Sequence, residues 1–195
     1  MRITTGSAKG RQVPLPKGAT VRPTSDRVKQ ALFNILGPGG LQGWNALDLF
    51  CGSGNLGLEA LSRGASMAAF CDQDRRCVEQ ARDLAQSFGL DAEGRCLYIA
   101  QEASVALARL ARESRRFHLV MIDPPYQSEA GPKALSSPLW PQLLHEGAWL
   151  IYEHETHKPL PATPGLALVR QASYGSTSLA FYQPLAAPSA VESAP

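Results

Sequence analysis

Apolar and polar positions along this chain follow two periods, and the change from one to the other predicts its elements. Five short apolar runs are predicted strands, at residues 45–50, 67–71, 95–99, 117–122 and 148–152. Beside them, apolar residues recur every three to four positions, which predicts helices at 55–63, 74–88, 102–112 and 138–145. Strands that are apolar throughout and alternate with helices are typical of a parallel sheet covered on both faces.

The beginning of the chain does not follow this alternation. Residues 2–6 and 11–15 flank a Ser-Ala-Lys-Gly turn and predict a small hairpin. A helix follows in the stretch TSDRVKQALFNIL, with Thr24 or Ser25 as its cap, and the GPGG sequence ends it. We therefore expect an N-terminal extension of one hairpin and one helix over residues 1–40.

The end of the chain also changes character. The runs LALVRQASY and STSLAFYQP lie on either side of Gly175 and predict an antiparallel strand pair. This pair closes a domain that we expect over residues 41–184. The tail at 185–195 consists of small residues and prolines and is predicted to be disordered.

Composition narrows the class of protein. The chain has 195 residues, of which 44% are hydrophobic, enough for one large domain with its own core. It contains no apolar run of about 18 residues, and its N-terminus lacks the apolar centre of a secretory signal. We expect a cytoplasmic protein without membrane contact, in which the four cysteines are reduced; they are Cys51, Cys71, Cys77 and Cys96.

The charge is distributed unevenly along the chain. Residues 1–30 hold seven Lys/Arg and one acidic residue, a formal charge of +6, whereas the rest of the chain carries −4. Such an arm is typical of a protein that holds a polyanion at one end, although a solvated extension explains the charge equally well.

The first predicted strand leads into a glycine loop, DLFCGSGNLG. Gly52, Gly54 and Gly57 satisfy G-x-G-x-x-G, a pattern that lets the backbone approach a ligand closely. Asp48 stands four residues before the first glycine, inside the strand. Its carboxylate would repel a pyrophosphate but attract an ammonium group, which favours S-adenosylmethionine over NAD as the ligand.

Acidic residues also end the second and third strands. Asp72 is expected to accept hydrogen bonds from ribose hydroxyls, a role common to both cofactors, and Asp74 is expected to cap the following helix. Glu102 is either an acceptor for an adenine amine or an acid that favours the start of a helix.

The fourth strand ends in the sequence DPPY, residues 123–126. Prolines cannot donate backbone hydrogen bonds and fix the chain beyond the strand. The carboxylate of Asp123 and the carbonyl of Pro124 could accept both N–H bonds of a planar exocyclic amine, while Tyr126 stacks on its ring. This arrangement would turn the weakly nucleophilic lone pair toward an electrophilic methyl group, so catalysis would rest on positioning and electrostatics.

Several stretches together resemble one known family. They are GSAKGR, RPTSDRVKQALFNIL, LDLFCGSGNLGLEALSRGA, DPPY and LIYEHE. The chain resembles the RsmD family, bacterial methyltransferases that modify the N2 of a guanine in small-subunit ribosomal RNA. The resemblance covers nearly all of residues 1–183 and implies a Rossmann-like class I methyltransferase sheet of seven mostly parallel strands with a reversed terminal strand.

The resemblance also implies roles for individual residues. S-adenosylmethionine is expected to bind around Asp48, Gly52, Ser53, Gly54 and Asp72. Three residues beside them in the sequence or at the strand ends are further candidate ligands: Cys51, whose other interpretation is a packing residue, Glu102 and Asp123. The residues expected to hold the target guanine are Asp123, Pro124, Pro125 and Tyr126. The residues expected to contact 16S ribosomal RNA, within the small subunit or an assembly intermediate of it, are Lys9, Arg11, Arg22 and Arg27.

Other functions remain open at this level. A DNA or protein amino-methyltransferase would use the same DPPY chemistry, and a non-catalytic RNA-binding assembly factor would explain the basic arm. An NAD-dependent dehydrogenase is opposed by Asp48. The EHETH stretch at 153–157 does not match H-E-x-x-H, so we expect a solvated, charged strand end there and no metal.

Overall fold

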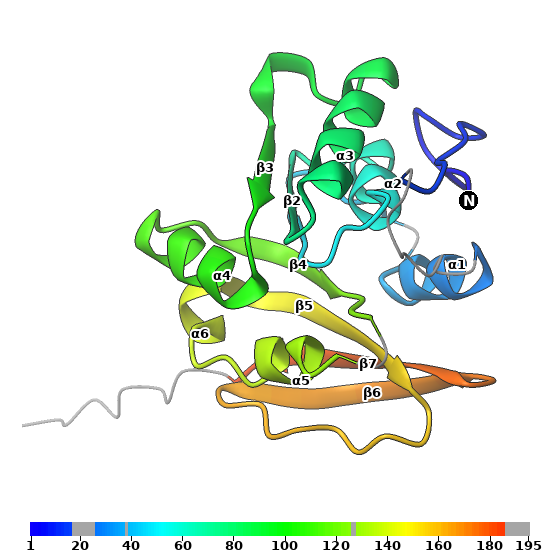
Figure 1. Cartoon of the computed structure of the whole chain (residues 1–195). Helices are drawn as coiled ribbons and strands as arrows, with labels where there is room; N and C mark the ends of the chain where they lie inside the picture. Colours follow the sequence, from blue (N-terminus) through cyan, green and yellow to red (C-terminus); the bar gives the residue numbers. More distant parts are fainter. Residues whose placement is uncertain (17–25, 38, 126–127, 186–195) are drawn as a thin grey trace, which may run out of the picture.

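The protein is built around one seven-stranded sheet of order β3-β2-β1-β4-β5-β7-β6 (Figure 1). The computed structural model describes residues 1–16, 26–37, 39–125 and 128–185. The strands are β1 (Asn45–Asp48), β2 (Met67–Asp72), β3 (Cys96–Ala100), β4 (Phe117–Ile122), β5 (Leu144–Glu155), β6 (Leu166–Tyr174) and β7 (Thr177–Pro184). The first five pair in parallel, and β7 is antiparallel to both β5 and β6. The predicted α/β sheet with one reversed strand is confirmed.

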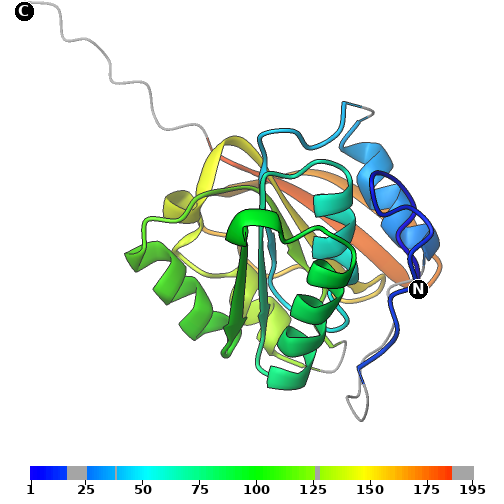
Figure 2. The ribbon, with the colours of Figure 1, turned by 90° about the horizontal axis from the view of Figure 1, so that it is seen from above.

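Helices cover both faces of the sheet. They are α1 (Asp26–Ile35), α2 (Asn55–Ser62), α3 (Arg75–Ser87), α4 (Ala103–Arg112), α5 (Ala130–Leu135) and α6 (Trp140–Leu143), with a 3-10 turn at Ala92–Gly94. The apolar residues of α1, α2 and α3 form one core cluster and those of α4, α5 and α6 form another (Figures 1 and 2). Within β4, Leu119 and Met121 join the first cluster and Val120 and Ile122 the second, as alternation along a strand requires.

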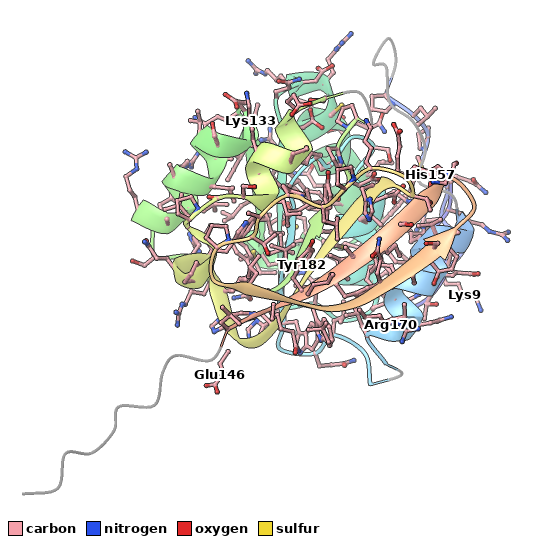
Figure 3. All side chains as sticks on the ribbon, turned by 90° about the horizontal axis from the view of Figure 1, so that it is seen from below. Lys9, Lys133, Glu146, His157, Arg170 and Tyr182 are labelled. Carbon is pink, nitrogen blue, oxygen red and sulfur yellow. The ribbon has the colours of Figure 1, made fainter. Side chains whose placement is uncertain are left out.

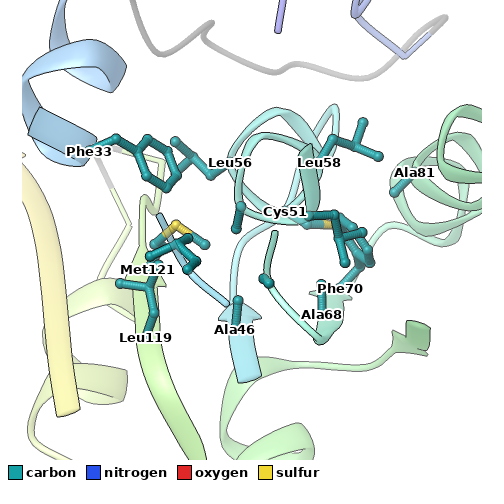
Figure 4. Packing of buried hydrophobic residues seen from close by; sticks show 14 of the residues in the cluster. Phe33, Ala46, Cys51, Leu56, Leu58, Ala68, Phe70, Ala81, Leu119 and Met121 are labelled. Atoms are coloured by element: carbon teal, nitrogen blue, oxygen red, sulfur yellow. The ribbon is translucent and has the colours of Figure 1, made fainter. Parts of the chain in front are cut away.

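The first cluster lies between α2 and the centre of the sheet. Figure 4 shows Leu56 beside Phe33 and above Met121, and Cys51 beside Phe70. Every residue of α2 is buried. The helix that starts directly after the glycine loop is therefore enclosed on all sides.

Two predicted elements in the second half of the chain need correction. The helix predicted at 138–145 is only the four-residue α6, and β5 begins at Leu144, much earlier than the predicted strand at 148–152. Leu144 pairs with Phe117 of β4, so sheet pairing decides a segment whose apolar spacing also fits a helix. The sequence also did not predict α5, because Gly131 and Pro132 are poor helix formers.

The predicted N-terminal hairpin is present but short: Arg2 and Gln12 form an antiparallel bridge, and backbone bonds join Ile3 to Arg11 and Gly10 and join Val13 to Met1. The backbone N–H groups of Thr4 and Thr5 donate instead to the Glu59 carboxylate, at 2.8 and 3.1 Å, and that of Ser7 donates to the Ser62 carbonyl. Helix α2 thus takes bonds that a partner strand would otherwise have made.

Smaller predictions about local structure have clear outcomes. Asp74 caps α3 by accepting from the Arg76 N–H at 3.0 Å, and Gly89 ends this helix with a φ of +69°. All four cysteines are buried and unbridged. The cap predicted at Thr24 or Ser25 lies outside the described residues.

Gly6 is the residue at which the N-terminal segment comes closest to α2. Its φ is +86°, and a Cβ there would lie 1.7 Å from the Ser62 carbonyl oxygen. Gly10 has nearly the same φ, +88°, but nothing lies within 4 Å of its Cβ position. A side chain at either position would strain the backbone, but only one at Gly6 would also clash with α2.

We predict that Gly6→Ala lowers the free energy of unfolding by at least ~2 kcal/mol more than Gly10→Ala, because only the first substitution also forces the segment away from α2. Urea unfolding gives the difference, and hydrogen exchange at Ser7 reports the local detachment. Equal losses in the two variants would contradict this packing.

Candidate functional site

The glycine loop makes a sharp turn between β1 and α2. Gly52 and Gly54 have φ values of +48° and +79°, which favour glycine, and the Gly54 N–H donates to the Cys51 carbonyl at 2.6 Å. A Cβ on Gly54 would lie 2.9 Å from the Cβ of Ala81 in α3. The loop therefore needs glycine both for its conformation and for its close approach to α3.

Asp48, the last residue of β1, has one paired and one unpaired carboxylate oxygen. Its side chain is 1% exposed, and Oδ2 accepts from the Gly57 N–H at 2.8 Å. Oδ1 is buried and has no hydrogen-bond partner in the described structure. A buried acceptor without a donor is costly, so this oxygen suits a ligand that brings a donor.

The acids predicted at the strand ends come together in space. Burial is the largest cause that raises the pKa of Asp48 to about 7; the Gly57 N–H opposes it, and the charges of Asp123 and Asp72 add to it. Asp72 accepts from the N–H groups of Gly52 and Asp74, at 3.0 and 2.9 Å, and burial raises its pKa. Because these strands are parallel, all three carboxylates lie at one edge of the sheet.

The end of β3 differs from the prediction in detail. Glu102 is exposed at the N-cap position of α4 and makes no side-chain capping bond. The preceding residue, Gln101, has a buried Oε1 without a partner in the described structure. The sequence analysis missed Gln101, although its place directly after a strand was a usable signal.

The DPP sequence after β4 is supported by α5. Pro124 is buried, and a Cβ on Gly131 of α5 would lie 2.4 Å from Cγ of Pro124, so the glycine lets α5 pack tightly against the proline ring. The exposed Pro125 uses its carbonyl to accept from the Ser128 N–H at 3.0 Å. Asp123 is partly buried at the same edge. Tyr126 lies outside the described residues.

Cys51 and Ser53, the other two predicted loop residues, are both buried. The Cys51 N–H donates to the Cys71 carbonyl at 2.9 Å, and its side chain belongs to the core cluster beneath α2. Burial, followed by the charge of Asp48, raises the pKa of the Cys51 thiol. Cys51 is therefore a neutral packing group under the loop.

The predicted RNA-binding residues have different surroundings. Lys9 and Arg11 are exposed, and Figure 3 shows Lys9 at the surface. The turn with Lys9 lies at the C-terminal end of α2, and Arg11 lies over the Phe88 ring at the end of α3. That places Lys9 about 12 Å, the length of an eight-residue helix, from the glycine loop. Arg22 and the side chain of Arg27 lie outside the described residues.

The EHETH stretch is solvated only at its end, where His157 is exposed, and not over its whole length as the sequence predicted. Glu153 and His154 are buried, His154 Nδ1 bonds to the Glu155 carbonyl at 2.9 Å, and its Nε2 lies 3.3 Å from the Gln171 amide. The antiparallel neighbour β7 covers this part of β5, which explains the burial. Among the described residues, no group of three or more His, Cys, Asp or Glu could hold a metal ion, and no helix is long and apolar enough to cross a membrane.

The strand order, the reversed β7 and the glycine loop after β1 define the class I methyltransferase fold. The family profile described as "Conserved hypothetical protein 95" matches residues 1–183. The Ribosomal RNA small subunit methyltransferase D of Haemophilus influenzae is 33% identical over 94% of this chain and 93% of its own. The chain belongs to this family, the RsmD family, as its motifs predicted.

Solved structures agree with this fold. The Thermus thermophilus protein TTHA0928 is 28% identical, covers 93% of this chain and 98% of its own, and has a TM-score of 0.75. SMU.776, a methyltransferase structure complexed with SAH, has a TM-score of 0.65 at 13% identity and covers 80% of this chain and 48% of its own, so its likeness is one of fold.

We predict that Asp48→Asn stabilises the unliganded protein above pH 7, by ~2 kcal/mol, because the folded state no longer holds a buried charge. Asp48 titrates at about 7 when folded and near 3.8 when unfolded, so the ionised residue destabilises the fold as pH rises between these values. The stabilisation should therefore vanish near pH 4. Urea unfolding at pH 4, 6 and 8 measures it, and a pH-independent difference would contradict the assigned burial.

Proposed function

We propose that this protein transfers a methyl group from S-adenosylmethionine to the N2 amine of a guanine in 16S ribosomal RNA. The single observation that carries the proposal is the unpaired, buried Oδ1 of Asp48 at the same sheet edge as Asp123 and Pro124. Family membership and the relative named ribosomal RNA small subunit methyltransferase D support the reaction class and the substrate.

The residues at this edge suit the cofactor. The ammonium group of its methionine part would supply the donor that Asp48 lacks, and the glycine loop leaves room for it beside the backbone. Asp72 would accept from ribose hydroxyls with the lone pairs not used by Gly52 and Asp74, and either Gln101 or Glu102 would accept from the adenine amine. The SAH in the structure of SMU.776 supports a cofactor of this type on this fold.

The DPPY sequence would orient the target base. The Asp123 carboxylate and the Pro124 carbonyl would accept the two N–H bonds of the guanine amine, and Tyr126 would stack on the ring. The Pro125 carbonyl is already bonded to Ser128, so Pro125 would act by fixing the backbone. Gly131 and α5 hold Pro124 from behind, which is the preorganisation that such positioning needs.

S-adenosylmethionine supplies an electrophilic methyl carbon bonded to a sulfonium. The base nitrogen forms the new N–C bond as the C–S bond breaks, and S-adenosylhomocysteine leaves. The nitrogen becomes acidic only as this bond forms, so Asp123, which already accepts that N–H, would take up the proton without needing a raised basicity.

RNA would be held by the N-terminal extension, residues 1–40, next to the catalytic domain of residues 41–184. Lys9 and Arg11 are exposed there, at the C-terminal ends of α2 and α3. Because these ends are distant from the glycine loop, the RNA would cover them as well as the sheet edge that holds Asp48 and Asp123. Contacts of this kind, with those of Arg22 and Arg27, would give an affinity that falls with salt.

The proposal is tested by nucleoside mass spectrometry of ribosomal RNA from cells with and without the gene. Loss of one N2-methylguanine from 16S RNA, and its return when purified protein and S-adenosylmethionine are added to small subunits, would support it. Transfer to DNA or peptide but not to RNA would favour the amino-methyltransferase alternative, and RNA binding without cofactor affinity would favour an assembly factor.

We predict that Asp123→Ala lowers kcat by at least ~100-fold, because the amine loses its oriented acceptor. Its affinity for S-adenosylhomocysteine should stay within about threefold of wild type, since Asp48 and the glycine loop remain. Methyl transfer to small subunits and calorimetry measure the two effects, with Asp83→Ala on the exposed face of α3 as the control. Loss of cofactor binding in Asp123→Ala would reject the proposed role.

We also predict that S-adenosylhomocysteine binds about tenfold more weakly at pH 6 than at pH 8. Asp48 is mostly protonated at pH 6, and the neutral acid loses its attraction for the ligand's ammonium group. In Asp48→Asn the binding should be weak and almost independent of pH over this range. Calorimetry at several pH values tests this, and an unchanged profile in the variant would contradict the pairing.

A further inference from the structure

A buried polar cluster links the N-terminal segment and α1 to the first turn of α2. It contains Lys29 of α1, Asn55 and Glu59 of α2, and backbone groups of Arg2 and Thr4. The side chains of Lys29 and Glu59 are 0% exposed, and Asn55 is 3% exposed. Lys29 belongs to the basic arm, yet its charge is enclosed and cannot meet RNA phosphates.

Among the described residues, three acceptors surround the ammonium group of Lys29. It donates to the Arg2 carbonyl and to the Asn55 Oδ1, the latter at 2.8 Å, and lies 3.1 Å from Oε2 of Glu59. Glu59 also accepts from Thr4 and from the Arg63 Nε, at 2.8 Å, so both charges are paired. The Asn55 Nδ2 is buried without a hydrogen-bond partner among the described residues, but both charges of the cluster are paired. Paired buried charges hold their residues in one geometry, because any shift leaves a buried charge without its partner.

The position of Asn55 connects this cluster to the glycine loop. Asn55 follows Gly54 directly and is the first residue of α2. Its side chain forms no capping bond to the loop, and its Oδ1 is held from outside by Lys29. The end of the loop is therefore held from the side away from the sheet by a residue 26 positions earlier in the chain.

We propose that Lys29 is a positioning residue for the cofactor site: through Asn55 it holds the Gly52–Gly54 loop in its binding conformation. Lys29 does not touch the ligand. The inference rests on the proposed function only in that S-adenosylhomocysteine binds at this loop. If this inference holds, cofactor affinity depends on the contact between the N-terminal segment and α2, since the Arg2 carbonyl is one of the acceptors that Lys29 contacts.

The test measures S-adenosylhomocysteine affinity by calorimetry in four single variants of the full chain and in the double variant Lys29→Met with Asn55→Ala. Lys29→Met removes the ammonium at similar length, and Lys29→Arg retains a charged donor. Asn55→Ala removes the acceptor next to the loop and leaves Glu59 paired with Arg63, so it tests the link even if Lys29→Met folds poorly. Arg2→Gln is the matched control, because it removes an exposed charge but keeps the backbone carbonyl.

We expect Lys29→Met and Asn55→Ala each to weaken binding about tenfold, and the double variant to be no weaker than either, because both break one link. Lys29→Arg should recover most of the affinity, and Arg2→Gln should match wild type. Thermal unfolding identifies the temperature at which every variant is folded, and binding is compared there.

Several results would overturn the inference. Wild-type affinity in Asn55→Ala, or additive losses in the double variant, would show that Lys29 does not act through Asn55. An equal loss in Lys29→Arg would show that charge and donors are not what matters. If the wild-type protein does not bind S-adenosylhomocysteine, the proposed function fails as well; if it binds and the variants bind equally, this inference alone fails.

Discussion

The complete burial of α2 is the constraint on which the rest of this structure depends. The helix starts at the glycine loop, lies on the centre of the sheet and leaves none of its residues exposed. Its polar side chains must therefore find partners inside the protein. Glu59 and Ser62 find them in the N-terminal segment, and Asn55 finds one in Lys29. The burial of α2 thus explains why the first residues of the chain pack against this helix.

The acids at the carboxyl ends of the strands, where α2 begins, are left incompletely paired: Oδ1 of Asp48 has no hydrogen-bond partner among the described residues. Parallel pairing of β1, β2 and β4 brings Asp48, Asp72 and Asp123 together. The charges of Asp72 and Asp123 raise the pKa of Asp48 in addition to the effect of its burial. Such a cluster costs stability in the absence of a ligand and binds a cationic group when one arrives. The site and its instability have the same physical origin, as is common where charge is prepared for binding.

Local rules were sufficient wherever a residue acts through its own backbone or its nearest neighbours. The cap at Asp74, the end of α3 at Gly89 and the strands β1 to β4 follow from short-range pattern and were predicted. The same rules failed at Leu144, where an apolar spacing that fits a helix became a strand through pairing with β4. They were incomplete at the N-terminus, where the hairpin forms but the backbone N–H groups of Thr4 and Thr5 donate to Glu59 of α2.

The sequence alone determined the alternation of β1 to β4 with α2, α3 and α4, the glycine loop and the acids at the strand ends, because each is encoded within about ten consecutive residues. The tertiary structure decided that Lys29 is enclosed rather than RNA-facing, that Gln101 rather than Glu102 has the buried unpaired oxygen, and that Gly131 supports Pro124. The burial of Lys29 and the support of Pro124 depend on contacts between residues that are separated in the chain. The difference between Gln101 and Glu102 depends on which of the two side chains faces the core. Residue type and spacing along the chain do not determine these contacts and orientations, which are set only when the helices pack against the sheet.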